Sequence, residues 1–303
     1  MQQQLSLQWV RSQLPTRAKQ SHKGTYGTLS VVGGCRNYRG AAILAVEGAL
    51  RAGTGIVRLC ATEPVCAAAA ARLSCCTFLT LNQSADGGID AASADDILNA
   101  SCKTMLIGPG LGNTEESFYL VLRLVQGATV PLVLDADALN VLAGSLAEGA
   151  SETHRVTGLA AISNAAHTPV LTPHIAELAR LCGLTNQQVL KDQQGAAASL
   201  AAQLKAVVVA KSDITIVASP SGNIYINDTA GNPGMAKGGS GDVLAGIIAA
   251  LMAQGISAEI SAACGVWLHA SAGDEAAALY GQAGMSPADL PACLTAVWQR
   301  LGL

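Results

Sequence analysis

The sequence predicts an α/β fold with a mostly parallel central sheet and helices on both faces. Short β-branched runs recur along the chain between alanine-rich helical stretches. Most of these runs are continuously apolar, which is typical of strands that are covered on both faces. Strand, helix and strand repeated in this order indicate a doubly wound sheet.

The elements follow from the apolar runs and from the residues that flank them. A helix is expected over residues 40–51, and Gly53 ends it. The last third of the chain is expected to be helical over residues 242–253, 258–280 and 290–300. Strands are expected over residues 28–32, 56–59, 104–107, 132–134, 169–171, 207–209, 215–218 and 224–226.

One domain is expected over residues 1–303, because no stretch has the character of a linker. The segment with the most loop-like composition, residues 81–100, is polar and turn-rich and is consistent with a surface loop and a helix within one domain. A formal net charge of −3, without local basic clusters, argues against nucleic-acid binding. The longest apolar run, residues 243–253, is too short to span a bilayer and suits a buried helix.

The nine cysteines indicate a reducing compartment. Their number is odd and no two have Cys-x-x-Cys spacing, which favours neither a disulfide framework nor a metal cluster. The first residues lack the basic and apolar stretches of a signal peptide. We therefore expect a cytoplasmic protein with reduced thiols. We also expect a homo-oligomer that binds neither nucleic acid nor membranes.

Glycine and polar residues follow several of the predicted strands. In open α/β sheets, ligands bind beyond the carboxyl ends of the strands. The site is therefore expected where these residues gather. They are Gly33, Gly34, Gly108, Gly110, Gly112, Asp135, Asp137, Thr172, His174 and Lys211.

The most informative segment is a glycine-rich loop, residues 238–241, directly before a strongly apolar helix. Its members are Gly238, Gly239, Ser240 and Gly241. Glycines let backbone N–H groups point at a ligand, and the helix N-terminus adds positive potential. This combination predicts a site for phosphate or for a phosphoryl group in transfer.

Asp242 lies at the mouth of the glycine-rich loop. A carboxylate there would repel a resting phosphate, so the position suits a base that takes a proton from an attacking hydroxyl. The alternative is a glycine-rich turn in which Asp242 merely caps the helix. Two other nucleotide motifs are absent: G-x-G-x-x-G fails at Asn113, and no Gly-Lys-Ser/Thr triplet follows a glycine loop.

Three further segments leave alternatives open. Asp135 and Asp137 are suited to hold Mg²⁺ through water. The alternative is a structural role, in which Asp135 forms a buried hydrogen bond and Asp137 caps a helix. His174 follows a strand and a proline, where a lone histidine is usually structural or solvated. Residues 211–215 link two strands and by themselves indicate only a hairpin-like turn.

Taken in order, these pieces resemble the NAD(P)H-hydrate dehydratase family, whose fold is ribokinase-like. The resemblance covers roughly residues 22–279, and the ordered set of motifs is highly specific. The matching segments are residues 22–27, 32–35, 38–42, 49–55, 107–112, 134–140, 171–174, 232–236 and 238–246.

The resemblance implies repair of hydrated NADH and NADPH, with Mg²⁺ and with ADP, or ATP, as phosphoryl donor. It implies that Ala41, Gly110, His174 and Asp242 contact the hydrate. It implies that Gly241 and the 211–215 turn contact the nucleotide. The turn consists of Lys211, Ser212, Asp213, Ile214 and Thr215. Many relatives carry an N-terminal epimerase domain, for which 303 residues leave no room, so a standalone dehydratase is expected.

The sequence departs from the family at two positions. Ser212 stands where glycine is usual and narrows the backbone freedom of the turn. Lys237 stands where threonine is frequent and is expected to add a charge near the phosphates.

The expected chemistry is transfer of a phosphoryl group to the hydrate hydroxyl, followed by loss of phosphate. Asp242 would be the base, and the glycine-rich loop would hold the moving phosphoryl. With ADP, the products would be AMP, phosphate and NAD(P)H. One alternative is a kinase of the same fold that makes a stable phosphoester on a hydroxymethyl group of a vitamin precursor. Another is a nucleotide-binding regulatory protein without turnover, against which Asp242 argues.

Overall fold

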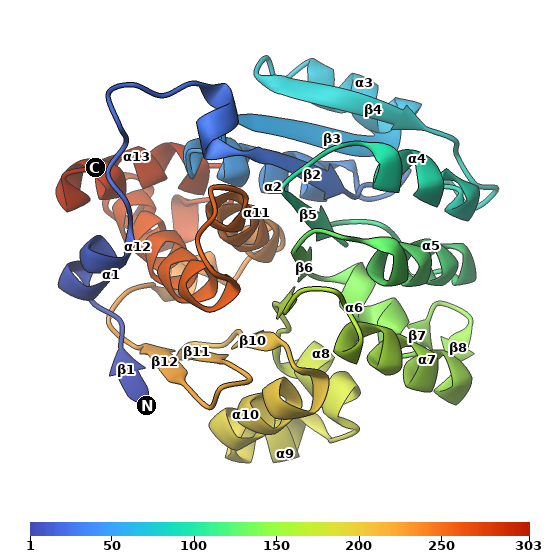
Figure 1. Cartoon of the computed structure of the whole chain (residues 1–303). Coiled ribbons are helices and arrows are strands. Elements are labelled where there is room, and N and C mark those ends of the chain that lie inside the picture. Colours follow the sequence, from blue (N-terminus) through green and yellow to red (C-terminus); the bar gives the residue numbers. More distant parts are fainter.

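The structure is a computed structural model that describes residues 1–303. One mixed sheet of ten strands forms its centre (Figure 1). The strands are β1 (Gln2–Gln4), β2 (Thr28–Val32), β3 (Ile56–Thr62), β4 (Cys76–Leu81), β5 (Thr104–Ile107), β6 (Leu132–Leu134), β9 (Val170–Leu171), β10 (Val207–Ala210), β11 (Thr215–Ala218) and β12 (Ile224–Asn227). Their order across the sheet is β1-β12-β11-β10-β9-β6-β5-β2-β3-β4. Only β11 runs antiparallel to its neighbours, so the mostly parallel sheet is confirmed.

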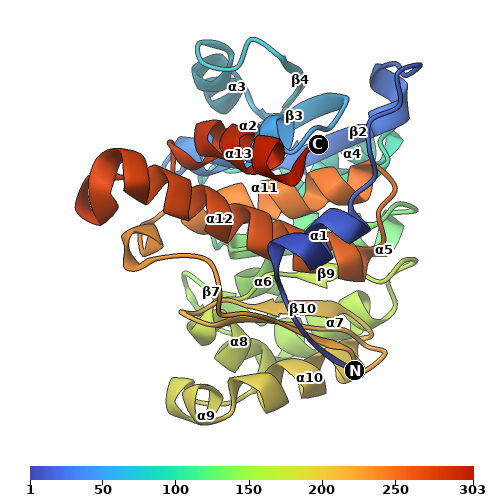
Figure 2. The same ribbon diagram turned by 90° about the vertical axis from the view of Figure 1, so that its left-hand side faces the viewer.

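Helices cover both faces of this sheet, as predicted. The first face carries α2 (Arg39–Arg51), α3 (Glu63–Ala70), α11 (Ser240–Ala253), α12 (Ala258–Gly284) and α13 (Leu290–Leu301). The second carries α4 (Ala94–Asn99), α5 (Glu115–Gly127), α6 (Asp137–Leu142), α7 (Glu152–Ser163), α8 (Ile175–Cys182), α9 (Asn186–Lys191) and α10 (Gln193–Leu204). Figure 2 shows α11, α12 and α13 lying together on their side of the sheet.

The interior strands are mostly apolar because they contribute side chains to two separate cores. In β6, Val133 packs with the α11 and α12 side, whereas Leu132 and Leu134 pack with the α5 and α6 side. Successive residues of a strand point to opposite faces, so a strand covered on both faces is apolar at most positions. This is why the apolar runs of the sequence located these strands.

Smaller elements complete the chain. They are α1 (Leu7–Gln13), a β7 (Ser145–Leu146) and β8 (Gly149–Ala150) hairpin, and the 3₁₀ turns η1 (Lys23–Tyr26), η2 (Ala91–Ser93) and η3 (Pro233–Met235). The segment over residues 81–100 holds a loop followed by η2 and α4, as expected. None of the helices combines the length and hydrophobicity that a membrane span would need.

The parallel pairing brings four strand ends to one edge of the sheet. Ile107 of β5 pairs with Leu134 of β6, and Leu134 pairs with Leu171 of β9. Leu171 in turn pairs with Val208 of β10. The residues that follow these strands therefore meet at the same end of the sheet, and α11 packs against β5 and β6.

Candidate functional site

A buried ion pair joins the ends of β6 and β10. The Lys211 ammonium lies 3.0 Å from Oδ1 of Asp135, and Thr172 donates its hydroxyl to the same oxygen at 2.6 Å. Asp135 is only 1% exposed, so these two donors replace the water that its carboxylate has lost. Burial acts to lower the pKa of Lys211, but the Asp135 and Glu177 carboxylates outweigh it, and the net shift is upward. Lys211 is therefore a permanent cation at this edge.

The glycine-rich loop lies directly against this cation. Gly239, the N-cap of α11, has φ 106°, a conformation that a residue with a side chain rarely adopts. A Cβ atom added to Gly241 would stand 3.1 Å from Nζ of Lys211. An ammonium group and the positive end of α11 thus converge on one point, an arrangement suited to an anion.

Asp242 is the acidic residue in the first turn of α11. Burial raises its pKa to about 7, and the Asp135 carboxylate adds to the rise while Lys211 opposes it. A group with this pKa exchanges its proton readily near neutral pH, as a general base must. Gly239, and not Asp242, is the N-cap residue, which argues against the capping alternative for Asp242.

His174 does cap a helix, as its structural alternative proposed. Its Nδ1 accepts from the backbone N–H groups of Ala176 at 3.1 Å and Glu177 at 3.4 Å, at the start of α8. The Glu177 carboxylate in return accepts from the His174 N–H at 2.9 Å, which completes a capping box. Because Nδ1 is an acceptor, the neutral ring carries its proton on Nε2. Burial, with Lys211 and Arg180, lowers the pKa of His174.

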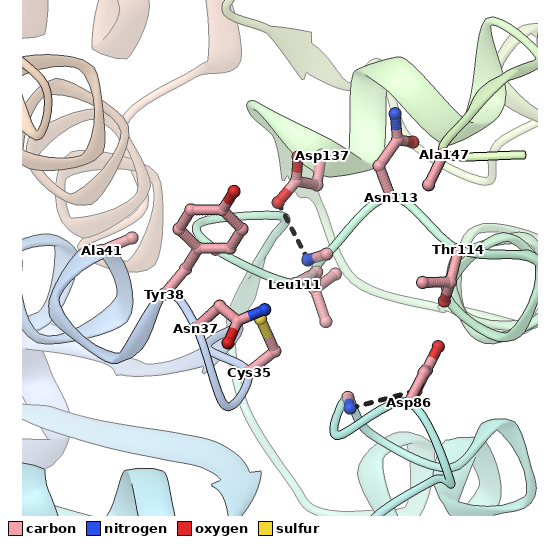
Figure 3. A pocket seen from close by; sticks show the side chains of 13 residues that line it. Cys35, Asn37, Tyr38, Ala41, Asp86, Leu111, Asn113, Thr114, Asp137 and Ala147 are labelled. Atoms are coloured by element: carbon pink, nitrogen blue, oxygen red, sulfur yellow. Dashed lines mark hydrogen bonds between the residues drawn. The ribbon is translucent and has the colours of Figure 1, made fainter.

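Asp137 ties the end of β6 to the loop after β5. Its Oδ2 accepts from the Gly112 N–H at 2.9 Å (Figure 3). Burial raises the pKa of this carboxyl group. Between the two aspartates, Ala136 has φ 49° and ψ −117°, an unfavourable conformation for a residue with a Cβ atom. Such local strain is found most often at ligand sites.

A cavity of about 440 Å³ opens between the loops after β2 and β5 (Figure 3). Gly110, at φ 65°, allows these loops to touch, since a Cβ atom there would stand 2.5 Å from the Tyr38 carbonyl oxygen. The lining residues are Cys35, Asn37, Tyr38, Ala41, Asp86, Gly88, Gly110, Leu111, Gly112, Asn113, Thr114, Asp137 and Ala147.

Comparison with known proteins decides the family. The model of the NAD(P)H-hydrate dehydratase family matches residues 29–295. The chain belongs to the NAD(P)H-hydrate dehydratase family.

Individual members of the family agree with this assignment. An ADP-dependent (S)-NAD(P)H-hydrate dehydratase of Neisseria meningitidis is 38% identical, over 85% of this chain and 80% of its own length. A bifunctional NAD(P)H-hydrate repair enzyme of Moorella thermoacetica is 41% identical over 94% of this chain, but the match covers 52% of that protein. The chain thus spans about half the length of the bifunctional relatives.

Solved structures support the ribokinase-like fold. An ADP/ATP-dependent NAD(P)H-hydrate dehydratase of Bacillus subtilis, co-crystallised with ATP and Mg²⁺, superposes with a TM-score of 0.82 and 30% identity. The superposition covers 98% of this chain and 97% of that one. A hydroxyethylthiazole kinase of Pyrococcus horikoshii shares only the fold, at a TM-score of 0.56 and 13% identity.

The two departures from the dehydratase family have local explanations. Ser212 does not have a positive φ angle, so the turn does not require glycine there. Its hydroxyl lies 2.9 Å from Oε1 of Gln193 and 2.7 Å from the Ile214 carbonyl oxygen, and it braces the turn. The Lys237 ammonium donates to the carbonyls of Ala283 and Met285 at the end of α12. Its charge is therefore held at that end of α12, and Lys211 supplies the ammonium beside the loop.

The structure places several of the predicted site residues in two groups. Ala41, Gly110 and Asp137 line the cavity, whereas His174 and Asp242 lie outside its lining. The second group surrounds the ion pair: Asp135, His174, Lys211, Gly241 and Asp242.

Several polar residues of the cavity were not predicted from the sequence. Tyr38 belongs to the matching segment 38–42, and Asn37 and Thr114 lie close to matching segments, so proximity in sequence was an available signal. Asp86 lies in the segment interpreted as a surface loop, and its carboxylate accepts from the Gly88 N–H at 3.2 Å. Nothing in its sequence context indicated that this loop reaches the site.

Proposed function

We propose that the protein is a nucleotide-dependent NAD(P)H-hydrate dehydratase that restores NADH and NADPH from their hydrated forms, with ADP as phosphoryl donor. The observation that carries this proposal is the juxtaposition of Lys211, Gly241 and Asp242. It combines a cation, a helix N-terminus and a carboxyl group with a pKa of about 7. Those are the components that transfer of a phosphoryl group to a hydroxyl requires.

In the proposed mechanism, Asp242 removes the proton of the hydrate hydroxyl as its oxygen attacks the terminal phosphorus of ADP. The bond from phosphorus to AMP breaks, while Lys211 and the glycine-rich loop stabilise the charge on the phosphoryl oxygens. The phosphoester then loses phosphate, assisted by the electron pair of the ring nitrogen. Loss of a proton from the adjacent ring carbon restores the dihydropyridine, so the products are AMP, phosphate and NAD(P)H.

The remaining predicted residues are assigned by where they lie. The hydrate would contact Ala41 and Gly110 in the cavity, with His174 and Asp242 next to it. The nucleotide would lie along the glycine-rich loop and the 211–215 turn, which the ion pair of Lys211 holds in place. The names of the relatives from Neisseria meningitidis and Xanthomonas campestris support ADP as donor.

Mg²⁺ would be held by phosphate oxygens and water, with Asp135 and Asp137 as the protein carboxylates. The residues fit such an ion: each aspartate has one carboxylate oxygen in a hydrogen bond described above and a second that is not. No group of three or more His, Cys, Asp or Glu side chains is placed to bind a metal directly. This suits Mg²⁺, which keeps several waters. When bound, it would neutralise phosphate charge.

We further propose that residues 1–303 act as one domain and assemble as a homo-oligomer. The single-domain proposal is supported by the sheet, in which β1 from the beginning of the chain pairs with β12 from its later part. Size-exclusion chromatography with light scattering measures the assembly state, and a monomer would contradict the homo-oligomer.

The direct test is to incubate the protein with NADH hydrate, Mg²⁺ and either ADP or ATP, and to follow the absorbance of NADH. The proposal predicts recovery of NADH together with equal amounts of phosphate and AMP when ADP is the donor. A kinase of the same fold would instead accumulate a stable phosphoester without NADH. Absence of both products with either nucleotide would contradict the proposal.

A further inference from the structure

One face of α12 contacts the segment that leads into the glycine-rich loop, residues 231–241. Asp274 accepts from the Gly231 N–H at 2.9 Å through one carboxylate oxygen. Through the other oxygen it accepts from the Asn232 side-chain amide at 3.1 Å. The start of the segment is thereby fixed to α12 by two hydrogen bonds to one carboxylate.

The middle of the segment rests on small residues of the same face. A Cβ atom added to Gly273 would stand 2.2 Å from Sδ of Met235, so only glycine leaves room for that side chain. Gly231, at the start of the segment, is also close to this face, since a Cβ atom added there would lie 3.5 Å from the Cβ atom of Ala270. The segment therefore lies in close contact with the helix surface over this turn.

The far end of the segment is held by His269, four residues before Gly273 on the helix. Its Nε2 lies 3.3 Å from Oγ of Ser240, and both residues are 8% exposed. Ser240 is the first residue of α11 and separates the two functional glycines, Gly239 and Gly241. Burial lowers the pKa of His269 to about 4. The ring is thus neutral near pH 7 and adds no charge of its own to the anion site.

We propose that α12 is the template for the glycine-rich loop and that His269 is a positioning residue, which acts on the phosphoryl site through the Ser240 hydroxyl. This inference rests on the proposed function of the loop. Donors that stabilise a transition state must be held in place before the reaction, because reorganising them at that moment is costly. A small displacement of such groups lowers the rate without removing the binding site.

A double-mutant cycle tests this role. H269F keeps a planar ring without hydrogen-bonding atoms, and S240A removes the other partner. Each change is expected to lower kcat roughly 3- to 10-fold, the effect of one ordinary hydrogen bond. The KM for NADH hydrate should change less than about twofold. The double variant should be no slower than S240A alone, because both changes break the same contact. H269Q, which restores a polar group, should recover most of the rate.

The control is S271A, which alters a buried serine of the same helix and should leave kcat unchanged. Effects of H269F and S240A that multiply would overturn the proposal, as would a lower melting temperature with an unchanged kcat. If H269F does not fold, H269N replaces it, since its shorter side chain does not reach Ser240. An inactive wild-type protein would defeat the proposed function instead. In that case calorimetry with ADP provides the cycle: equal, modest losses of affinity in H269F, S240A and the double variant would support the role of His269, and losses that multiply, or no loss, would overturn it.

Discussion

Asp242 gains a proton more readily in the folded protein than in the unfolded chain. Burial, with Asp135, raises its pKa from an ordinary value of 3.8 to about 7. The raised pKa adds to the free energy of unfolding. This contribution is fully present below about pH 4 and is lost as the pH rises through about 7. Catalysis has the opposite requirement, because a base must be unprotonated. Asp242 therefore lowers stability under the conditions in which it is proposed to work.

Replacing Asp242 by asparagine separates these two effects. D242N should fold and lose about 10²- to 10⁴-fold in kcat, the usual effect of removing a general base. Its melting temperature at pH 8 should equal or exceed that of the wild type, because the buried charge is gone. The kcat of the wild type should rise with pH up to about 7 and then level off. A kcat of D242N close to wild type would remove Asp242 from the mechanism.

His174 caps α8, and we propose that it also contacts the hydrate, so H174A would alter both functions at once. H174A removes both the α8 cap and the Nε2 proton donor, so it should cost about 0.5–2 kcal/mol of stability. It should also lower kcat/KM for the hydrate roughly 5- to 150-fold. H174N keeps an N-cap acceptor and is the matched control: its melting temperature should match the wild type, with KM for the hydrate still raised. An H174N variant with normal KM would show that His174 only caps the helix.

The positions of the interior strands could be predicted from the sequence, because burial on both faces of the sheet requires mostly apolar residues. The interior strands β2, β5, β6 and β10 are largely apolar, with Ser30 and Thr104 as buried exceptions, and all were located within a residue or two. The edge strands β1 and β4 were missed. β1 consists of Gln2–Gln4, which are mostly exposed, and it forms because β12 offers unpaired backbone groups. Glutamines carry no strand signal, so only the tertiary structure determines this pairing.

Nucleotide binding by the glycine-rich loop can be tested with a substitution at Gly241. G241V introduces a branched side chain whose Cβ atom alone would stand 3.1 Å from Nζ of Lys211. It should displace the ammonium and fill the space through which phosphate approaches the backbone. Affinity for ADP, measured by calorimetry, should fall, whereas the melting temperature without nucleotide should change little. An unchanged affinity would show that the loop does not bind the nucleotide.

For the whole molecule, the sequence predicted the site only where it is carried by local motifs. The glycine-rich loop and the strand-end residues were found because each sits next to its own strand or helix. The cavity was not, because its lining comes from five separate stretches, including Asp86 and Ala147. The contacts of His269 and Asp274 were missed for the same reason. They join α12 to a loop far away in sequence.

The reactivity of the cysteine thiols can be predicted from their burial. All nine cysteines are free, as the sequence predicted, and only Cys75 is exposed. Burial raises the pKa of both Cys60 and Cys264 to about 12, which keeps them unreactive. Titration should therefore find nine thiols in denaturant without reductant, and rapid reaction of Cys75 alone in the native protein. Two or more missing thiols would indicate a disulfide.

The proposed mechanism requires that the hydrate hydroxyl is phosphorylated before it leaves. The most direct measurement uses NADH hydrate prepared with ¹⁸O in that hydroxyl and follows the label by mass spectrometry after turnover with ADP. Attack of the hydroxyl oxygen on phosphorus, followed by cleavage of the carbon–oxygen bond, places the ¹⁸O in the released phosphate. We therefore predict one ¹⁸O atom in each phosphate formed per NADH. Unlabelled phosphate, with the label in water, would contradict phosphoryl transfer to the hydrate.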